Sequence, residues 1–357
     1  MYNPVISIMK GLAIIGVVVG HCGLSLWSES FVNQWHLATF FFVVGLCFKD
    51  KYVLQSKLYI KRRIRSLYVP FVEFGLLFLV MHNALYMMHC IGNEYSIPEM
   101  GWELFNLTVL LTSDEPLMGA MWFCPALLFA SIIMMLTKKL VCKDTDISMI
   151  SKIEEILFPI IVLVVGYTAI QLHIKSPYCV WQYMVLSFII WMGYWFKCYV
   201  KADYWSTMIH IVVATTGFTL IACATNYGFI ARLQPVCINK ENIIVLILIP
   251  ILAGLSVYSL ATLLNKTKIQ SVLAYIGDHS FSIMALHFLA FKIVNLVQIC
   301  FNGYDIGRLV EFPVIDYGSL WGWACLYVVA GVSMPLILAY AYNIVKRWVA
   351  ARCGTLI

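Results

Sequence analysis

Long apolar stretches separated by short polar ones make up most of this chain. Uninterrupted apolar stretches of about twenty residues are typical of transmembrane helices, and they lack the alternation that marks the strands of a membrane barrel. The pattern predicts an all-α, polytopic transmembrane helical bundle of about ten spans, in a single domain over residues 1–357. We expect the spans near 5–27, 36–48, 69–88, 119–136, 156–173, 180–196, 207–225, 243–263, 279–300 and 319–345.

Composition agrees with this pattern and excludes a soluble protein. Hydrophobic residues make up 62% of the chain and charged residues 12%, with a mean hydropathy of +0.87. A soluble domain carries about twice that share of charge. The twelve cysteines lie mostly inside apolar stretches and form no C-x-x-C pair. We therefore expect neither a metal site nor a disulfide framework.

The distribution of basic residues predicts how the chain is oriented. With a cytoplasmic N-terminus, the cytoplasmic segments contain 18 Lys and Arg and the outer segments contain four, while two more lie inside spans. This asymmetry follows the positive-inside rule and predicts that both termini are cytoplasmic. It also accounts for the net charge of +6, so we expect a lipid-bilayer protein that binds no nucleic acid.

The first span contains two polar residues at membrane depth, Lys10 and His21. They are eleven residues apart, which places them only about 20° apart around a helix and roughly 16 Å apart along it. Polar groups in this environment are expensive and often functional. A cation and an imidazole on one face suit a long anionic ligand that enters from inside. In the alternative interpretation, Lys10 extends to the interface and His21 caps the outer end.

A basic segment precedes the third span and contains Lys61, Arg62, Arg63 and Arg65. Such a cluster commonly fixes topology and contacts anionic lipid. Alternatively, its guanidinium groups form a phosphate clamp, for which Arg62 and Arg65 project to nearly the same side of a regular helix.

Several segments together resemble the integral-membrane acyltransferase-3 family, in particular its fucose-4-O-acetylase-like branch. SIMKGLAIIGVVVGHC is similar to the opening helix with its Arg/Lys-x10-His motif, and WHLATFFFVVGLCF to the aromatic second helix. KRRIRSLYVPF resembles the R-x-x-R segment before the third helix. MWFCPALLFA and YIGDHSFSIMALHF are similar to two later helices of the family.

The resemblance implies an O-acyltransferase that moves an acyl group, by default acetyl from acetyl-CoA, from the cytoplasm to a hydroxyl of a surface glycan or its precursor. It implies that His21 is catalytic, and that Lys10, Arg62 and Arg65 bind the acyl donor. Weaker candidates for substrate binding are His36, Trp122 and His287. The predicted topology also suggests a bacterial cytoplasmic (inner) membrane location, and we expect no metal.

Elementary chemistry supports the same assignment. A sugar hydroxyl is almost un-ionised at neutral pH, so its attack on a thioester needs a positioned base, and histidine is the usual one. The phosphates of coenzyme A call for basic groups at the cytoplasmic mouth. Two other features have simpler expected roles: Glu73 pairs with the basic segment, and Asp114 and Glu115 are solvated loop charges.

A transporter or flippase for a polysaccharide or a lipid-linked glycan is the competing function. Ten spans with intramembrane charges fit it equally well, and transporters often contain inverted repeats. The two halves of this chain show no such symmetry, because Lys10 and His21 have no counterparts in the second half. This difference favours the acyltransferase.

Overall fold

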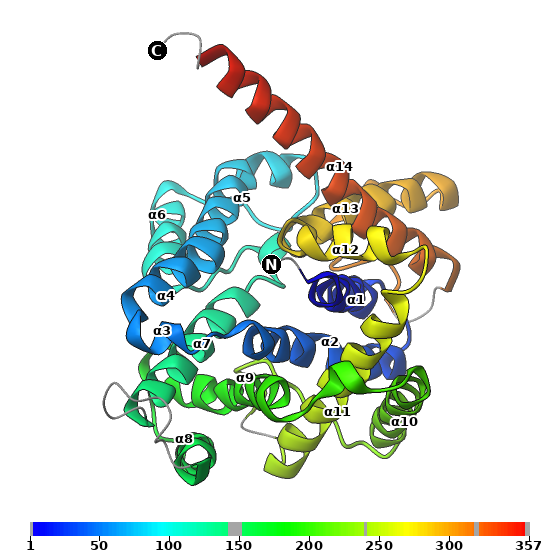
Figure 1. The fold of residues 1–357 in the computed structure, drawn as a ribbon. Helices are drawn as coiled ribbons and strands as arrows, with labels where there is room; N and C mark the ends of the chain where they lie inside the picture. Colours follow the sequence, from blue (N-terminus) through cyan, green and yellow to red (C-terminus); the bar gives the residue numbers. More distant parts are fainter. Residues whose placement is uncertain (1–2, 142–151, 239–240, 318–320, 354–357) are drawn as a thin grey trace.

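A computed structural model describes residues 3–141, 152–238, 241–317 and 321–353, and these residues contain helices and no strand (Figure 1). Ten helices are long and apolar enough to cross a membrane, which confirms the predicted all-helical multi-pass fold. The α-helices are α1 (Pro4–His21), α2 (Leu26–Cys47), α3 (Lys51–Leu54), α4 (Ser56–Arg63), α5 (Val69–Met87), α6 (Ile97–Phe105), α7 (Phe123–Val141), α8 (Lys152–Gln171), α9 (Val180–Tyr199), α10 (Thr207–Asn226), α11 (Ile243–Leu264), α12 (Gln270–Asp278), α13 (Ser280–Asn302) and α14 (Trp321–Cys353).

The first two spans meet in a much tighter turn than the sequence pattern predicts. Asn3 caps α1 by accepting a hydrogen bond from the backbone of Val5, and α1 ends at His21. Gly23 adopts a φ of +80°, which reverses the chain, and the side chain of Ser25 caps α2. The expected start of the second span at residue 36 is therefore wrong by ten residues. The polar residues that suggested a loop form the first turns of α2 instead.

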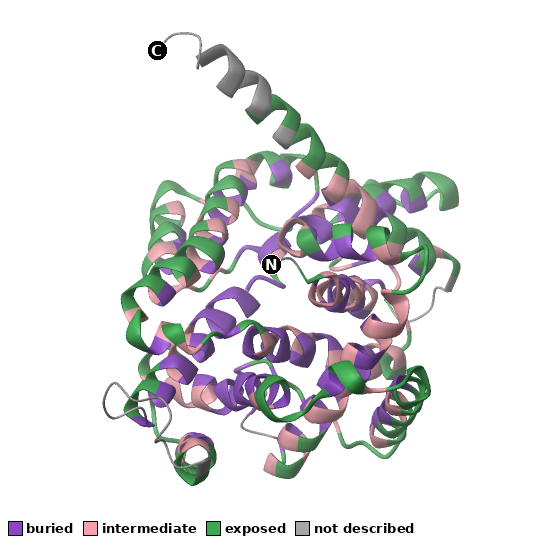
Figure 2. Cartoon of the chain, viewed as in Figure 1, coloured by how far each residue is buried: buried purple, intermediate pink, exposed green. Residues whose placement is uncertain are grey.

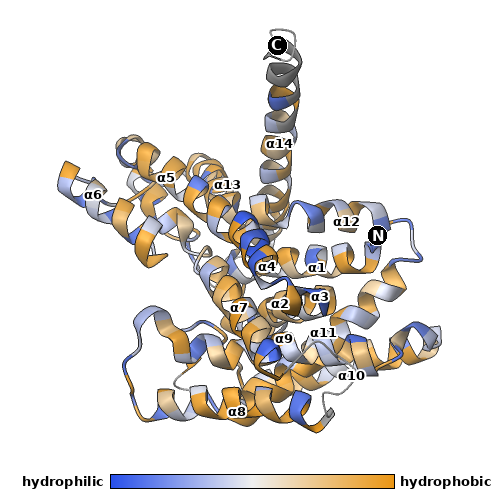
Figure 3. Ribbon diagram, turned by 60° about the vertical axis from the view of Figure 1, so that its left-hand side comes forward, coloured by the Kyte–Doolittle hydropathy of each residue, from blue (hydrophilic) through white to orange (hydrophobic). Residues whose placement is uncertain are grey.

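The basic segment is continuous with the third membrane helix. A π-helix over Ile64–Tyr68 joins α4 to α5, so residues 56–87 run as one long helical unit. Figure 3 shows that α4 is hydrophilic, whereas α5 is mostly hydrophobic. A π-helix turns less per residue than an α-helix, so it changes which side of the helix the following residues face.

Helix α1 occupies the centre of the bundle, between α2 and the pair α12 and α13 (Figure 1). It approaches α12 backbone to backbone, because a Cβ built on Gly277 lies 1.8 Å from the carbonyl oxygen of Ser7. Figure 2 shows that α2, α7, α9 and α13 are largely buried, while α8 and α10 expose most of their surface. The polar residues of α1 therefore face the protein interior rather than lipid.

Candidate active site

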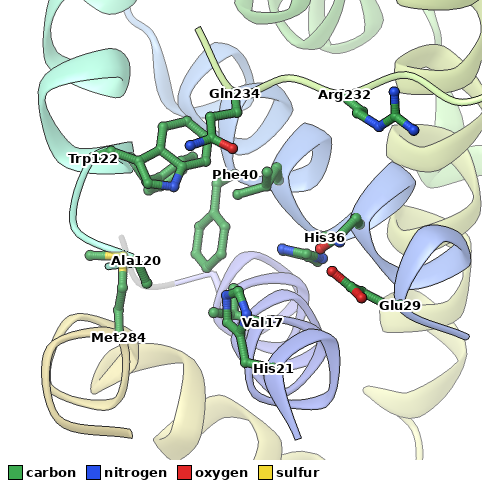
Figure 4. Close-up of a pocket in the computed structure, with 13 residues that line it drawn as sticks. Val17, His21, Glu29, His36, Phe40, Ala120, Trp122, Arg232, Gln234 and Met284 are labelled. Carbon is green, nitrogen blue, oxygen red and sulfur yellow. The ribbon is translucent and has the colours of Figure 1, made fainter. Parts of the chain in front are cut away.

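A cavity of about 170 Å³, the histidine cavity, lies beside the end of α1 that contains His21. Helix α2 contributes Glu29, Asn33, His36 and Phe40 to its wall. These residues follow one another at spacings of four, three and four, so they share one face of the helix. Figure 4 shows how His21 and this face of α2 enclose the space. The cavity thus brings together three of the predicted site residues, His21, His36 and Trp122.

Three histidines surround the base of this cavity, and only His21 keeps both ring nitrogens available. The rings of His21 and His287 stack with their centroids 5.6 Å apart. The Nδ1 of His36 lies 2.8 Å from the carbonyl oxygen of Val32, and that of His287 lies 2.9 Å from the carbonyl of Met284. A carbonyl accepts only, so Nδ1 of both rings carries the proton. No described residue hydrogen-bonds to His21, which leaves its ring available to a substrate.

The segment that contributes Trp122 is held in place by buried carboxylates. Glu115 is 3% exposed, and its Oε2 lies 2.6 Å from Nδ1 of His82 in α5. Ser113 donates a 2.5 Å hydrogen bond to Glu103, which is also buried. Burial raises the pKa of Glu115, although the contact with His82 opposes the rise. The expectation that Glu115 is a solvated loop charge is therefore wrong.

A second loop provides the polar wall opposite His21. Arg232 and Gln234 line the cavity, and Figure 4 shows both side chains among those that surround it. Gln34 of α2 anchors this loop, because its Oε1 accepts a 3.4 Å hydrogen bond from the backbone of Ala231. Arg232 also pairs with Glu241 at 3.4 Å. The wall therefore offers an amide and a guanidinium, both suited to hydroxyl groups.

Residues 304–317 form a third segment, which is linked to the cavity wall through Glu29. The buried Lys292 of α13 donates to the carbonyls of Leu309 and Glu311, both at 2.8 Å, and so fixes the segment to the helix. The Tyr317 hydroxyl donates a 2.6 Å hydrogen bond to Glu29 in the cavity wall. Lys292 therefore positions a loop, which explains the second lysine within a span without giving it a catalytic role.

A second cavity of about 440 Å³, the lysine cavity, lies nearer the start of α1. Lys10 lines it and pairs with Asp278 at 3.2 Å, while Ser7 donates a 2.7 Å hydrogen bond to the same carboxylate oxygen. Arg63 also lines this cavity, with its guanidinium 5.0 Å from the centroid of the Tyr59 ring. Two cations and one carboxylate leave a net charge of +1, which favours an anionic ligand.

The predicted donor residues Arg62 and Arg65 lie outside the lining of this cavity. Arg62 donates a 2.8 Å hydrogen bond to the hydroxyl of Tyr52, and Arg65 is exposed on the π-helix. The cavity-facing side of the segment is formed by Arg63 together with Ser66 and Leu67, which follow it by three and four residues. Arg62 lies about 100° away from Arg63 around the helix. The role of Arg62 and Arg65 in donor binding stays a prediction.

The two cavities adjoin at a constriction. Phe40 of α2, Phe123 of α7 and Met284 of α13 contribute to the walls of both. Lys10 and His21 stand on either side of this constriction, roughly 16 Å apart along the same face of α1, as their spacing predicts. A long ligand held near Lys10 reaches His21 only by passing these three side chains.

Filling the constriction tests whether the acyl donor passes through it to His21. We expect Met284→Trp to lower acyl transfer at least tenfold while coenzyme A binding in detergent stays within twofold of wild type, because the ring fills the junction and leaves the lysine cavity open. Met284→Leu is the volume-conserving control and is expected to keep normal turnover. Unchanged turnover in a folded Met284→Trp variant contradicts a passage at this point.

Sequence reasoning missed Glu29, Asn33, Arg232, Gln234 and Asp278 as wall residues, and it named Arg63 only as a member of the basic segment. Asp278 had a local signal, since it is a charged residue between two apolar helices. Arg232 and Gln234 had none, because only the fold brings their loop back to α2. The described residues contain no cluster of three or more His, Cys, Asp or Glu that could hold a metal ion.

Fold and site together define a multi-pass membrane protein with two adjoining cavities, one lined by a histidine and the other by a lysine and an arginine. The profile of the acyltransferase-3 family, described as an acyltransferase domain, matches residues 3–342. The chain therefore belongs to this family and is a membrane acyltransferase. No curated protein and no solved structure matches the chain.

Proposed function

We propose that this protein transfers a short acyl group from cytoplasmic acyl-CoA to a hydroxyl of a glycan or glycan precursor, with His21 as general base. The observation that carries the proposal is the position of His21, whose ring has no hydrogen-bonding partner among the described residues and lines the histidine cavity, which adjoins the lysine cavity. Acetyl is the proposed acyl group, in keeping with the fucose-4-O-acetylase-like branch that the sequence resembles.

The lysine cavity suits the acyl donor. Its net positive charge and the mixed polar and apolar wall match a phosphate-bearing molecule with a long flexible arm. A third cavity of about 380 Å³ shares Ile6 and Cys47 with the lysine cavity and is lined by Lys49 and Lys197. It offers further room and charge for the nucleotide end of the donor. The lysine cavity lies beside Lys10 and the basic segment. Because basic segments of membrane proteins usually face the cytoplasm, we propose that this cavity opens to the cytoplasm.

The histidine cavity suits the acceptor. In the proposed reaction the acceptor hydroxyl oxygen attacks the thioester carbonyl while His21 takes the hydroxyl proton. The carbon–sulfur bond then breaks, and the sulfur leaves with a proton as the free thiol of coenzyme A. Trp122 provides an aromatic face for a sugar ring, and Glu29 and Gln234 provide hydrogen-bonding groups for its hydroxyls.

A donor and an acceptor that approach from opposite ends require no movement of the acyl group across the bilayer as a separate step. The proposed location is a bacterial cytoplasmic membrane, with the histidine cavity towards the outer side. A transporter remains the competing function, since a route across the bundle is what a transporter also needs. Transport, however, does not require a histidine without a hydrogen-bonding partner in the cavity wall, whereas general-base catalysis does.

The test of this function is the release of free thiol from acetyl-CoA by the purified protein in detergent. We expect thiol release that rises when glycan acceptors are supplied, and covalent transfer of the acetyl group to the acceptor by mass spectrometry. If the folded protein neither binds nor consumes acetyl-CoA or another short acyl-CoA, with glycans present, the transporter becomes the better explanation.

A further inference from the structure

A fourth space in the molecule has no part in the proposed reaction. It is a groove of about 690 Å³ between α5, α13 and α14, called here the lateral groove. Leu77, Leu286, Leu289 and Leu338 give it an apolar wall. Because Leu77 and Leu338 are 45% and 51% exposed on membrane-length helices, the groove opens towards the lipid.

The polar residues of the lateral groove all lie at the same depth. Phe74 of α5 packs on Phe281 of α13, with ring centroids 5.9 Å apart, so Glu73 is level with His279 and Ser282. Helix α14 runs in the opposite direction to α13. Its Gly331 lies against Phe291 of α13. Tyr342 comes eleven residues after Gly331, and His279 comes twelve residues before Phe291. In antiparallel helices these two residues therefore lie at the same level.

The leucines lie deeper along the same helices. Leu77 is one turn beyond Glu73 on α5, and Leu286 and Leu289 follow Ser282 on α13. Leu338 is one turn before Tyr342 on α14. Three helices therefore build one gradient, polar at the end near Lys10 and apolar further into the membrane. This gradient matches a lipid in the leaflet on the Lys10 side.

Glu73 determines which headgroup fits. Its side chain forms no ion pair or hydrogen bond with any described residue, so the expected pairing with the basic segment is wrong. A carboxylate at this depth is expensive unless a cation accompanies it. Lys346, on the next turn of α14, lies with its Nζ 5.9 Å from the centroid of the Tyr342 ring. The end of the groove thus offers an anion and, one turn away, a cation.

We propose that the lateral groove binds a phospholipid with a primary-amine headgroup, of the phosphatidylethanolamine type. Its ammonium group donates hydrogen bonds to Glu73, its phosphate lies towards Lys346, and one acyl chain follows the leucines. A choline headgroup has no N–H to donate to Glu73. A headgroup that is only anionic can place its phosphate near Lys346, but it has no cation to pair with Glu73. This proposal does not depend on the proposed enzymatic function.

The test is competition between defined lipids, read by native mass spectrometry of the delipidated protein. The mixture contains equimolar palmitoyl-oleoyl phosphatidylethanolamine, phosphatidylcholine and phosphatidylglycerol. We expect wild type to retain the ethanolamine lipid about tenfold over the other two, because one charge-assisted hydrogen bond changes affinity by about that factor. Glu73→Gln is expected to remove this preference. Glu94→Gln, an exposed acidic residue outside the groove, is the matched control and should keep it.

Thermal unfolding of the same samples separates binding from misfolding. The ethanolamine lipid is expected to raise the midpoint of wild type and Glu94→Gln but not that of Glu73→Gln, whose lipid-free midpoint should match wild type. Equal retention of all three lipids by wild type overturns the proposal. An unchanged preference in Glu73→Gln also overturns it, as does stronger retention of the glycerol lipid.

Discussion

His21→Asn is expected to lower the turnover number for acyl transfer by about 10²- to 10⁴-fold, the range that one general base contributes. The side chain keeps a polar group in the histidine cavity but removes the base. Because the lysine cavity lies on the other side of Phe40, Phe123 and Met284, the KM for acetyl-CoA should change less than threefold. Steady-state kinetics of the purified variant, with free thiol as the readout, measure both values.

Two controls separate a catalytic His21 from a structural one. His89→Asn replaces an exposed histidine outside the cavities and should leave kinetics unchanged. In wild type the rate should fall at low pH as the base becomes protonated, whereas the residual rate of His21→Asn should lack this fall. Turnover within threefold of wild type in His21→Asn, or loss of coenzyme A binding with it, contradicts the assignment.

The ten-span helical fold followed from the sequence, because the apolar length of a span is a local property. The alignment of Lys10 with His21 followed as well, since both lie on one regular helix. The start of α2 did not, because Glu29 and Asn33 are polar and resemble a loop until the cavity that they line is known. Local polarity cannot distinguish a solvated residue from one that faces an internal cavity.

The buried charges outside the cavities show the same limit. Lys138 of α7 is 3% exposed. It pairs with Asp50, just before α3, at 3.2 Å and with Glu155 of α8 at 2.6 Å. Burial opposes the ionisation of Asp50, but hydrogen bonds from Tyr194 and Lys138 outweigh it and hold its pKa below the usual range. In the sequence Lys138 is simply one of the basic residues that fix topology. Only the fold shows that it also ties α7 to its neighbours.

Among the three arginines of the basic segment, Arg63 is expected to matter most for the donor. Arg63→Gln should raise the KM for acetyl-CoA and the Kd for coenzyme A about tenfold or more, because a charge-assisted contact to phosphate contributes roughly 1.5–3 kcal/mol. Arg62→Gln and Arg65→Gln, which remove the same charge from side chains outside the cavity lining, should change both values less than threefold.

The comparison of coenzyme A with pantetheine, which lacks its nucleotide phosphates, identifies the group that Arg63 contacts. Arg63→Gln should weaken coenzyme A and leave pantetheine binding unchanged, and Arg63→Lys should recover part of the loss because it restores charge without the guanidinium geometry. Larger effects from Arg62→Gln and Arg65→Gln than from Arg63→Gln instead support the R-x-x-R pair that the sequence resemblance implies. In that outcome the basic segment must rearrange when the donor binds, since Arg62 and Arg65 lie outside the lining of the lysine cavity.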